Sequence, residues 1–251
     1  MKLIWTYDGT VGKLDNTNKK RIILINYYIL SITKAKKLGY HTIIYVTPES
    51  KDIFDGVANE IIIVEQKYNT KLWDYLKIYV LNNRNDNFIL IDGDVILNKK
   101  LPEVTEDILF DTYEIPNWEF EYYDTIKQFL DLGIKNKVDY WSLEKRPVMN
   151  LGILYIKNEK LKNEYILKWN IINDWMNTLD TNVVLNLDRA TMVVSQFLIT
   201  LISDYWGLSR KYITNHIGDE NEYYTHYCGN IKFVRQIVSS DKIIKSQKSF
   251  I

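Results

Sequence analysis

The chain has 251 residues, of which 32 are basic and 32 acidic, so its formal net charge is zero. A chain of this size folds as one domain with elaborations and can bury a large core, and a single cysteine excludes an intramolecular disulfide and a cysteine-rich zinc site. Zero net charge argues against a general nucleic-acid binder. The N-terminus reaches an acidic residue, Asp8, without the long apolar run of a signal peptide, and no apolar run in the chain reaches the ~20 residues of a membrane span. We therefore expect a cytoplasmic protein without an integral membrane segment, and the richness in Lys, Asn, Ile and Tyr indicates a low-GC bacterial, phage or viral source.

The first hundred residues alternate between strand and helix patterns. β-branched and apolar runs predict strands, and apolar residues at helical spacing predict helices, the first of them ending at Gly39. Strand–helix repetition at this spacing predicts a mostly parallel sheet with crossover helices. The predicted strands cover residues 3–7, 41–47, 60–64 and 87–91, and the predicted helices residues 19–38 and 69–81. We expect residues 1–100 to form a nucleotide-binding half.

The remaining residues predict an acceptor and catalytic half over 101–235 and a tail over 236–251, within one domain. Residues 101–146 look irregular, acidic and aromatic, which is typical of a functional loop or lid. A strand is expected at 150–156, and helices at 160–177 and 188–203. The aromatic residues of this half could form a platform for an acceptor sugar or a packed core; they are Trp118, Phe120, Tyr122, Tyr123 and Trp141.

Asp92-Gly93-Asp94 directly follows a strand that reads as buried on both faces. In open α/β sheets ligands bind beyond the carboxyl ends of the strands, and two carboxylates there can share one Mn²⁺ or Mg²⁺ ion that also holds a diphosphate. Gly93 lets the backbone approach a ligand. The alternative is a surface turn with two solvated acids.

A second motif lies near the C-terminus, where His226, Gly229 and Lys232 are spaced three residues apart. A neutral imidazole is a good ligand for a first-row ion, a glycine allows close approach of the backbone, and a lysine can neutralise phosphate. The alternative is a packed or hydrogen-bonded histidine.

Taken together, the two motifs resemble those of GT-A fold glycosyltransferases, in particular family eight, the glycogenin and lipopolysaccharide galactosyltransferase group. The resemblance implies that Asp92, Asp94 and His226 bind Mn²⁺, which grips the diphosphate of a UDP-sugar. It also implies that Gly229 and Lys232 lie at the diphosphate. The expected fold is α/β, with a Rossmann-like, mostly parallel central sheet flanked by helices and an acceptor-side subregion.

Other stretches are similar to that family over about residues 1–235. Asn150-Leu151-Gly152 resembles the strand that lines the sugar and acceptor site, and Ser195-Gln196 the helix start near the reacting anomeric carbon. The residues that the resemblance places at the nucleoside or donor are Thr6, Tyr7, Asp8 and Lys71. Two departures are Ser195, where an acid is common, and Phe233-Val234 after the lysine.

If the resemblance holds fully, the enzyme retains the anomeric configuration, with Gln196 beneath the reacting carbon. An inverting enzyme would need an acid as base, for which Asp188 or an acid within 111–121 could serve. Each residue also has a structural reading: Gln196 as a bridging helix residue, Asp188 as an N-cap, Tyr7 as core, and Asp8 as part of a turn.

The sequence therefore predicts a metal-dependent glycosyltransferase that transfers a sugar from a UDP-sugar to a hydroxyl of a glycan or protein. Three alternatives remain open. A haloacid-dehalogenase-like phosphatase also uses Asp-x-Asp after a strand, but after its first strand. A nucleotidyltransferase would normally carry a glycine- and arginine-rich N-terminal loop. An inactive module that binds nucleotide sugars is the third.

Overall fold

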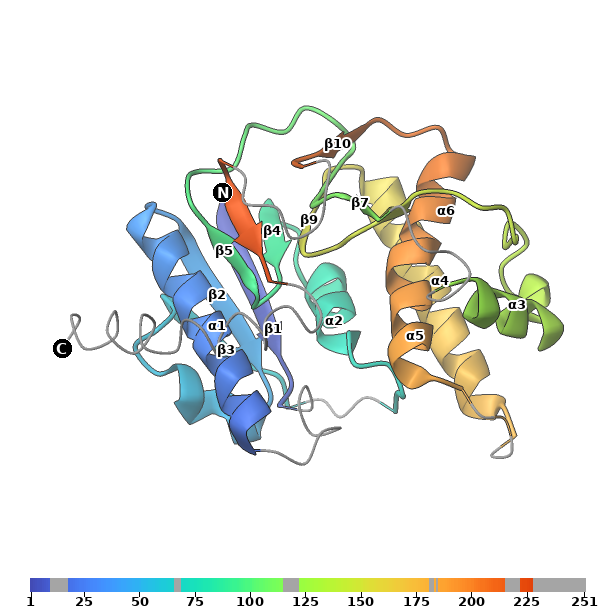
Figure 1. Ribbon diagram of the computed structural model, residues 1–251, viewed down its shortest axis with the longest axis horizontal. Helices are drawn as coiled ribbons and strands as arrows, with labels where there is room; N and C mark the ends of the chain where they lie inside the picture. The colour runs from blue at the N-terminus through green and yellow to red at the C-terminus, as the bar shows by residue number, and fades with distance from the viewer. Residues whose placement is uncertain are drawn as a thin grey trace.

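A seven-stranded sheet forms the centre of the computed structural model, which describes residues 1–9, 18–65, 69–114, 122–180, 183, 185–214 and 222–227 (Figure 1). The strand order is β10-β6-β9-β4-β1-β2-β3. β9 runs antiparallel to both of its neighbours, and the other pairs are parallel. The predicted α/β class with a mostly parallel central sheet is confirmed. The strands are β1 (Lys2–Tyr7), β2 (His41–Val46), β3 (Glu60–Ile63), β4 (Phe88–Ile91), β6 (Ile108–Phe110), β9 (Ile153–Ile156) and β10 (Arg210–Tyr212).

The first four strands of the sheet form where the sequence predicts them. β1 pairs with β2 from Lys2↔His41 to Tyr7↔Val46, and with β4 on its other side. Every residue of β4 is buried, as a strand between two neighbours and two helical layers requires. Because β1 and β4 are parallel neighbours, Asp8 and Asp92, which follow them, emerge at the same edge of the sheet.

One face of the sheet is covered by α1 (Asn18–Lys37), the 3₁₀ turn η1 (Pro48–Phe54) and a small antiparallel pair of β5 (Val95–Leu97) with β11 (Tyr224–His226). Helix α1 ends as predicted, with Gly39 in the left-handed region at φ 82°. The hydroxyl of Ser31 accepts from Trp5 Nε1 at 3.0 Å and donates to the carbonyl of Val95 at 2.5 Å. These bonds join α1 to β1 and β5.

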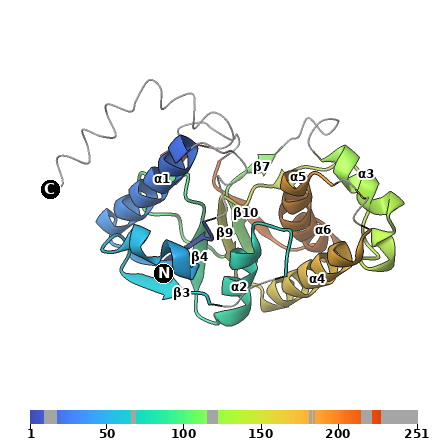
Figure 2. The same cartoon turned by 90° about the horizontal axis from the view of Figure 1, so that it is seen from below.

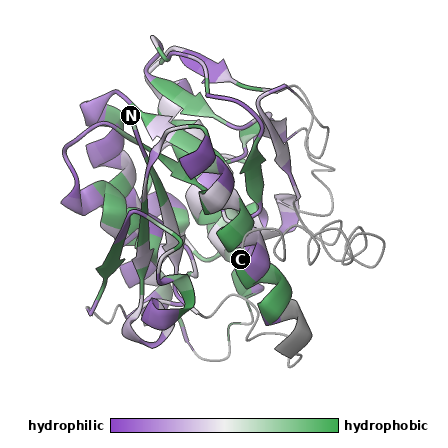
Figure 3. Ribbon diagram, turned by 90° about the vertical axis from the view of Figure 1, so that its left-hand side faces the viewer, coloured by the Kyte–Doolittle hydropathy of each residue, from purple (hydrophilic) through white to green (hydrophobic). Residues whose placement is uncertain are grey.

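The other face carries a larger helical layer (Figure 2). It consists of α2 (Tyr75–Asn83), α3 (Tyr123–Asp131), the 3₁₀ turn η2 (Ile134–Asn136), α4 (Glu159–Thr178), α5 (Leu187–Met192), the π-helical turn η3 (Val193–Phe197) and α6 (Leu198–Tyr205), with a short antiparallel pair of β7 (Tyr113–Glu114) and β8 (Val148–Met149). Colouring by hydropathy shows apolar strands between helices with mixed surfaces (Figure 3). Among the described residues, no helix is long and apolar enough to cross a bilayer.

Trp141 lies in the core of this helical layer. Its ring stacks on Phe129 at 5.7 Å between centroids and meets Phe197 edge-on at 5.5 Å. Trp141 and Tyr122 are both fully buried, so for these two the packed-core interpretation is confirmed and a sugar platform is wrong. Trp118 and Phe120 lie outside the described residues.

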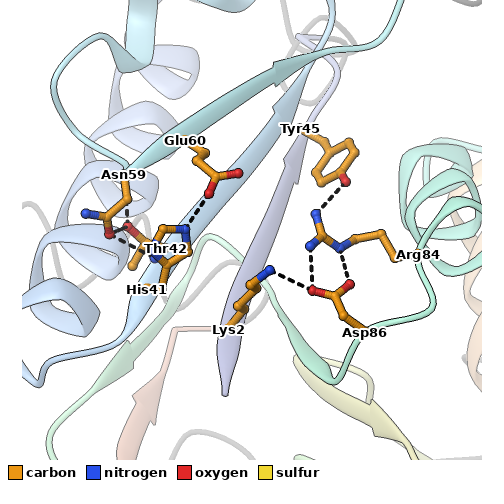
Figure 4. A network of polar contacts seen from close by, with 8 residues as sticks. All are labelled: Lys2, His41, Thr42, Tyr45, Asn59, Glu60, Arg84 and Asp86. Carbon is orange, nitrogen blue, oxygen red and sulfur yellow. Dashed lines mark hydrogen bonds and ion pairs between the residues drawn. The ribbon is translucent and has the colours of Figure 1, made fainter.

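A network of polar contacts joins β1 and β2 to the segment that follows α2 (Figure 4). Arg84 donates two hydrogen bonds to Asp86 at 2.8 and 2.6 Å and a third to the hydroxyl of Tyr45, and Lys2 Nζ lies 2.9 Å from Asp86. The bidentate arginine holds the pKa of Asp86 well below its usual range. Lys2 begins β1 and Tyr45 is near the carboxyl end of β2, so Arg84 and Asp86 tie the two strands to the segment that follows α2.

The region 101–146, which the sequence predicts as irregular, contains regular structure in its described part. β6, β7, α3 and η2 all fall within it. The strands there have two or three residues, too short for an alternating pattern to be recognised.

Two predicted helices also differ from the structure. The helix predicted over 69–81 begins at Tyr75, because the hydroxyl of Thr70 accepts the backbone N–H of Leu72 at 3.0 Å and holds a turn instead. The helix predicted over 188–203 is interrupted by η3. Ser195 Oγ donates to the carbonyl of Thr191 at 2.7 Å, and bonds of this kind compete with the helical ladder.

Candidate active site

A pocket of about 120 Å³ opens at the carboxyl ends of β1 and β4. Five of the predicted site residues line it, namely Thr6, Asp8, Asp92, Gly93 and Asp94. Helix α1 and the start of α2 provide the other walls, with Leu24, Tyr28, Trp73, Asp74, Leu76 and Lys77. The sheet therefore brings Thr6 and Asp8, from the predicted nucleoside site, and the acidic motif to one cavity.

Lys77 binds the first carboxylate of the motif. Its Nζ lies 2.6 Å from Asp92 Oδ1, and both side chains are largely withdrawn from solvent. The same ammonium group donates to the carbonyl of Leu151 at 3.4 Å, and the backbone N–H of Asp92 donates to the carbonyl of Gly152 at 2.8 Å. Lys77 thus places a positive charge inside the pocket and fixes Asp92 against the β9 segment.

His226 reaches the second carboxylate through strand pairing. β11 runs antiparallel to β5, and His226 is paired with Val95, the residue after Asp94. The side chains of His226 and Asp94 meet with 3.5 Å between Nε2 and Oδ1, and the backbone N–H of Tyr227 donates to the carbonyl of Asp94 at 3.0 Å. The strand register therefore brings together two predicted metal ligands that are far apart in the sequence.

Asp111 fixes the orientation of the His226 ring. The carboxylate is fully buried; Oδ2 lies 2.5 Å from His226 Nδ1, and Oδ1 accepts from the hydroxyl of Tyr224. Because a carboxylate accepts, the Nδ1–H donates to it, and the Nε2 atom is the one that faces Asp94. Burial lowers the pKa of His226, but Asp111 and then Asp94 outweigh it and raise the pKa well above its usual value.

The residues fit a divalent ion by their chemistry. An imidazole Nε2 lone pair and a carboxylate cannot face each other without a cation between them, which is either a proton or a metal. Two ligands that each lie about 2.1 Å from an ion are separated by about 3–4 Å, which matches the 3.5 Å of His226 and Asp94. Within the described residues no three acidic, histidine or cysteine side chains converge on one point, and Asp92 is held by Lys77.

Gly152 makes room for the histidine and its partner. A Cβ at this position would lie 2.6 Å from His226 Cε1 and 2.8 Å from Asp111 Oδ2. Neither atom can retreat, because both side chains are buried. The glycine that the sequence assigns to a sugar-binding strand is therefore required by the packing of His226 against Asp111.

Gly93, the middle residue of the acidic motif, also makes room for a neighbouring side chain. A Cβ there would lie 2.2 Å from the ring of Tyr28, whose hydroxyl donates to the carbonyl of Thr6 at 3.0 Å. Burial, followed by the charges of Asp92 and Asp94, raises the pKa of Tyr28 well above its usual value, so the phenol stays neutral. The ring of Tyr28 is thus fixed between β1 and the acidic motif.

Replacing Gly93 with alanine is expected to destabilise the protein by about 1–3 kcal/mol, because the new methyl group overpacks the Tyr28 ring. Urea unfolding of the single variants Gly93→Ala and Tyr28→Ala and of the double variant measures this cost. We expect the double variant to be more stable than the sum of the single costs predicts. Strict additivity would contradict the contact.

Gln196 and Asn150, both predicted as site residues, meet in a second polar cluster. Tyr122 contacts Gln196 Oε1 and Glu114 Oε2 through its hydroxyl, and Asn150 Nδ2 donates to Glu114 Oε1 at 2.6 Å. Asn150 Oδ1 accepts from the backbone N–H of Gly152 at 2.8 Å, which links this cluster to the histidine side of the site. Gln196 itself lies in η3, and π-helical turns are frequent at functional sites.

Three predicted site residues lie elsewhere. The ring of Tyr7 is buried between Tyr28 and Phe54, with centroids 5.2 Å from each, so it offers no face for uracil and the core interpretation is confirmed. Lys71 is exposed outside the pocket lining, and its Nζ donates to the carbonyl of Met176 at 3.5 Å.

Asp188 is exposed in the first turn of α5, outside the pocket lining. The N-cap of this helix is Asn186, which accepts the backbone N–H of Arg189 at 3.1 Å, so the N-cap reading of Asp188 is wrong. Gly229 and Lys232 lie outside the described residues.

The structure adds Lys77 and Asp74 to the pocket lining and Asp111 as the partner of His226. The sequence names Asp111 only as one acid of a loop. Each carries a weak local signal: Asp74 and Lys77 are a charged pair three residues apart, and Asp111 follows a short apolar run. Their role becomes visible only when the strands place them beside Asp92 and His226.

Comparisons with known proteins give distant likenesses. No protein-family model and no curated protein sequence matches the chain. Among solved structures, the chain is similar to mouse xyloside xylosyltransferase 1 in its apo form, at 13% identity over 84% of each chain with a TM-score of 0.43. It is also similar to the inositol-1-phosphate CTP transferase of T. maritima, at 14% identity over 84% of each chain with a TM-score of 0.43. The PaToxG glycosyltransferase is 15% identical over 81% of this chain and 69% of that chain, with a TM-score of 0.44. Likenesses at this distance identify no family.

Proposed function

We propose that the chain is a metal-dependent glycosyltransferase that moves a sugar from a UDP-sugar to a hydroxyl of a glycan or protein acceptor. One observation carries the proposal. Asp94 at the carboxyl end of β4 and His226 of β11 stand 3.5 Å apart beside a pocket, with the histidine held by a buried carboxylate. This arrangement supports a divalent cation at the Asp92-Gly93-Asp94 motif, as the resemblance to family eight implies.

Asp94 and His226 would hold the ion, with Asp92 as the third ligand once it leaves Lys77. Carboxylate and imidazole donors suit Mn²⁺ or Mg²⁺. When bound, such an ion neutralises the negative charge of the leaving diphosphate. Lys77 can also neutralise the charge of the diphosphate without moving far, because its ammonium group already lies in the pocket and can pair with a phosphate oxygen.

The rest of the site is assigned by the same logic. Thr6 and Asp8 line the pocket at the end of β1, which fits the nucleoside. Asn150, Gly152 and Gln196 are joined through the polar cluster of Tyr122 and Glu114, which we assign to the transferred sugar and the acceptor. In this proposal Gln196 lies beneath the reacting carbon and the anomeric configuration is retained, while Gly229 and Lys232 complete the diphosphate site.

The phosphatase alternative receives less support. A phosphatase of the haloacid dehalogenase type would use Asp92 as a nucleophile after the first strand of its sheet. Here the motif follows β4, the fourth strand in the chain, and Asp92 is paired with Lys77.

We expect UDP to bind at least about tenfold more tightly with Mn²⁺ than without it, and we expect Asp94→Ala to abolish this difference. Calorimetric titration of UDP with and without Mn²⁺, on the wild type and on Asp94→Ala, makes the measurement. Asp131→Asn is the matched control, because it removes one exposed carboxylate that is paired with Lys127 on α3. If UDP and other nucleoside diphosphates fail to bind with any divalent ion, the proposed function is wrong.

A further inference from the structure

Trp73 is a tryptophan of the pocket lining that stays accessible. The residue is 37% exposed, whereas Trp5, Trp141 and Trp169 are fully buried in the core. Every other residue that lines the pocket is buried or half-buried. Within the described part of the chain, the ring of Trp73 stacks on no other aromatic ring, and its Nε1 has no hydrogen-bond partner. An apolar surface of this size is unfavourable in water, and here it borders a cavity in which a ligand can cover it.

Backbone contacts on the segment before α2 hold this indole at the pocket. Leu72 is buried, and its backbone N–H donates to the hydroxyl of Thr70 at 3.0 Å. One residue earlier, the carbonyl of Asn69 accepts from the side chain of Asn177 of α4 at 2.7 Å. A side chain on a segment that is already ordered loses little conformational freedom when it meets a ligand. Trp73 is therefore presented to the pocket in a defined place.

Tyr28 is the second aromatic residue that lines the pocket, and its ring is already engaged by its neighbours. It meets the rings of Tyr7 and Phe54 edge-on, at 5.2 and 6.0 Å between centroids. A Cβ added at Gly93 would lie 2.2 Å from the same ring, so the backbone also packs against it. Trp73 therefore offers the larger accessible aromatic surface in the pocket.

The pocket combines charged groups with an apolar surface. The acidic motif and Lys77 supply charged groups, and Leu24, Leu76 and Trp73 supply apolar ones. Helices α1 and α2 cover opposite faces of the sheet (Figure 2), so Leu24 of α1 and Trp73 before α2 approach the pocket from opposite sides. A matching ligand has an anionic part for Lys77 and a flat aromatic part for the indole. A nucleoside diphosphate has both.

We propose that Trp73 stacks on the nucleobase of the donor and gives it the aromatic face that the buried Tyr7 cannot offer. Every base has a π-face, so stacking adds affinity and leaves the choice of base to other groups. Tryptophan suits this role, because it supplies a large apolar area with few rotatable bonds. The inference rests on the proposed function, since it takes the ligand to be a nucleotide sugar.

The test compares UDP with inorganic pyrophosphate, which has the diphosphate but no base. With Mn²⁺ present, the wild type, Trp73→Ala and Trp73→Phe are titrated with both ligands in a calorimeter. We expect Trp73→Ala to bind UDP about five- to a hundredfold more weakly than the wild type and pyrophosphate within about twofold of it. Trp73→Phe should recover most of the affinity for UDP, because it keeps an aromatic face.

Tyr205→Ala is the matched control. It removes an aromatic side chain that is 67% exposed on α6 and lies outside the pocket lining. We expect this variant to bind UDP and pyrophosphate as the wild type does. A loss of UDP affinity in Trp73→Ala that this control does not share belongs to the pocket.

Tryptophan fluorescence gives a readout that a purely structural role of Trp73 would not move. A base that stacks on an indole quenches its emission. We expect UDP to quench part of the emission of the wild type and pyrophosphate to leave it unchanged. In Trp73→Phe the quenching by UDP should be lost while UDP still binds.

The outcomes separate this inference from the proposed function. If Trp73→Ala binds UDP as tightly as the wild type, the inference is wrong and the proposed function stands. Parallel losses of UDP and pyrophosphate in Trp73→Ala would also overturn the inference, because they would show a disturbed diphosphate site. If the wild type binds neither ligand with any divalent ion, the proposed function fails and this inference with it.

Discussion

Gly152→Ala is expected to weaken Mn²⁺-dependent UDP binding by about ten- to a hundredfold and to destabilise the protein by about 1–3 kcal/mol. The added Cβ would lie 2.6 Å from His226 Cε1 and 2.8 Å from Asp111 Oδ2. Since no positive φ is involved at Gly152, the backbone tolerates alanine and the whole effect is steric. The methyl group must push the imidazole away from Asp94. His226 Nε2 and Asp94 Oδ1 then lose the spacing at which they can share an ion.

A double variant separates the steric effect of the added methyl group from the loss of His226 as a metal ligand. In Gly152→Ala/His226→Ala the ring is gone, so we expect part of the lost stability to return while metal-dependent binding stays absent. Gly56→Ala is the control, because an added Cβ there meets nothing within 4 Å. Its positive φ of 73° costs stability, yet UDP binding should equal that of the wild type. Normal UDP binding by Gly152→Ala would contradict the position given to His226.

The acidic motif was predictable because its signal is local. A run of apolar residues that is buried on both faces identifies β4, and the carboxyl end of such a strand is where ligands bind. The strands and helices of the first hundred residues follow from the same patterns. For these elements, the residues that determine the structure are neighbours in the chain.

The resemblance assigned the positive charge at the diphosphate to Lys232 and placed Lys71 at the donor, and the sequence did not identify Lys77, which lies in the pocket. Lys71 and Lys77 both fall in the helix predicted over 69–81, and nothing in the periodicity distinguishes them. The turn held by Thr70 delays α2 until Tyr75, which turns Lys71 toward α4 and Lys77 into the pocket. A hydroxyl-to-backbone bond of this kind is not visible in a hydrophobic pattern.

Asp111 could not be predicted because its role depends on pairings between distant segments. It follows β6, while His226 and Tyr224 arrive on β11 by pairing with β5. β5, β6 and β11 have three residues each, so each strand is fixed by its neighbours and not by its own pattern.

Asp74 is expected to make the stability of the wild type fall with rising pH relative to Asp74→Asn. Burial raises the pKa of Asp74 from 3.8 to about 7, while Lys77 of its own helix and Trp169 and Ser195 opposite lower it. Below pH 4 the carboxyl group is protonated in both the folded and the unfolded chain, and the pKa difference contributes nothing. Between pH 4 and 7 the unfolded chain releases the proton and the folded chain keeps it, so folding becomes less favourable as pH rises.

Three pKa units correspond to about 4 kcal/mol, so this is the expected difference in the free energy of unfolding that develops between pH 4 and 7. Urea unfolding of the wild type and of Asp74→Asn over this range measures it. Every other titrating group, including Tyr165, whose pKa burial and Asp74 raise, is common to both chains, and most of their contributions cancel in the difference. A difference that is constant with pH would show that Asp74 is ionised in the folded protein and has partners there.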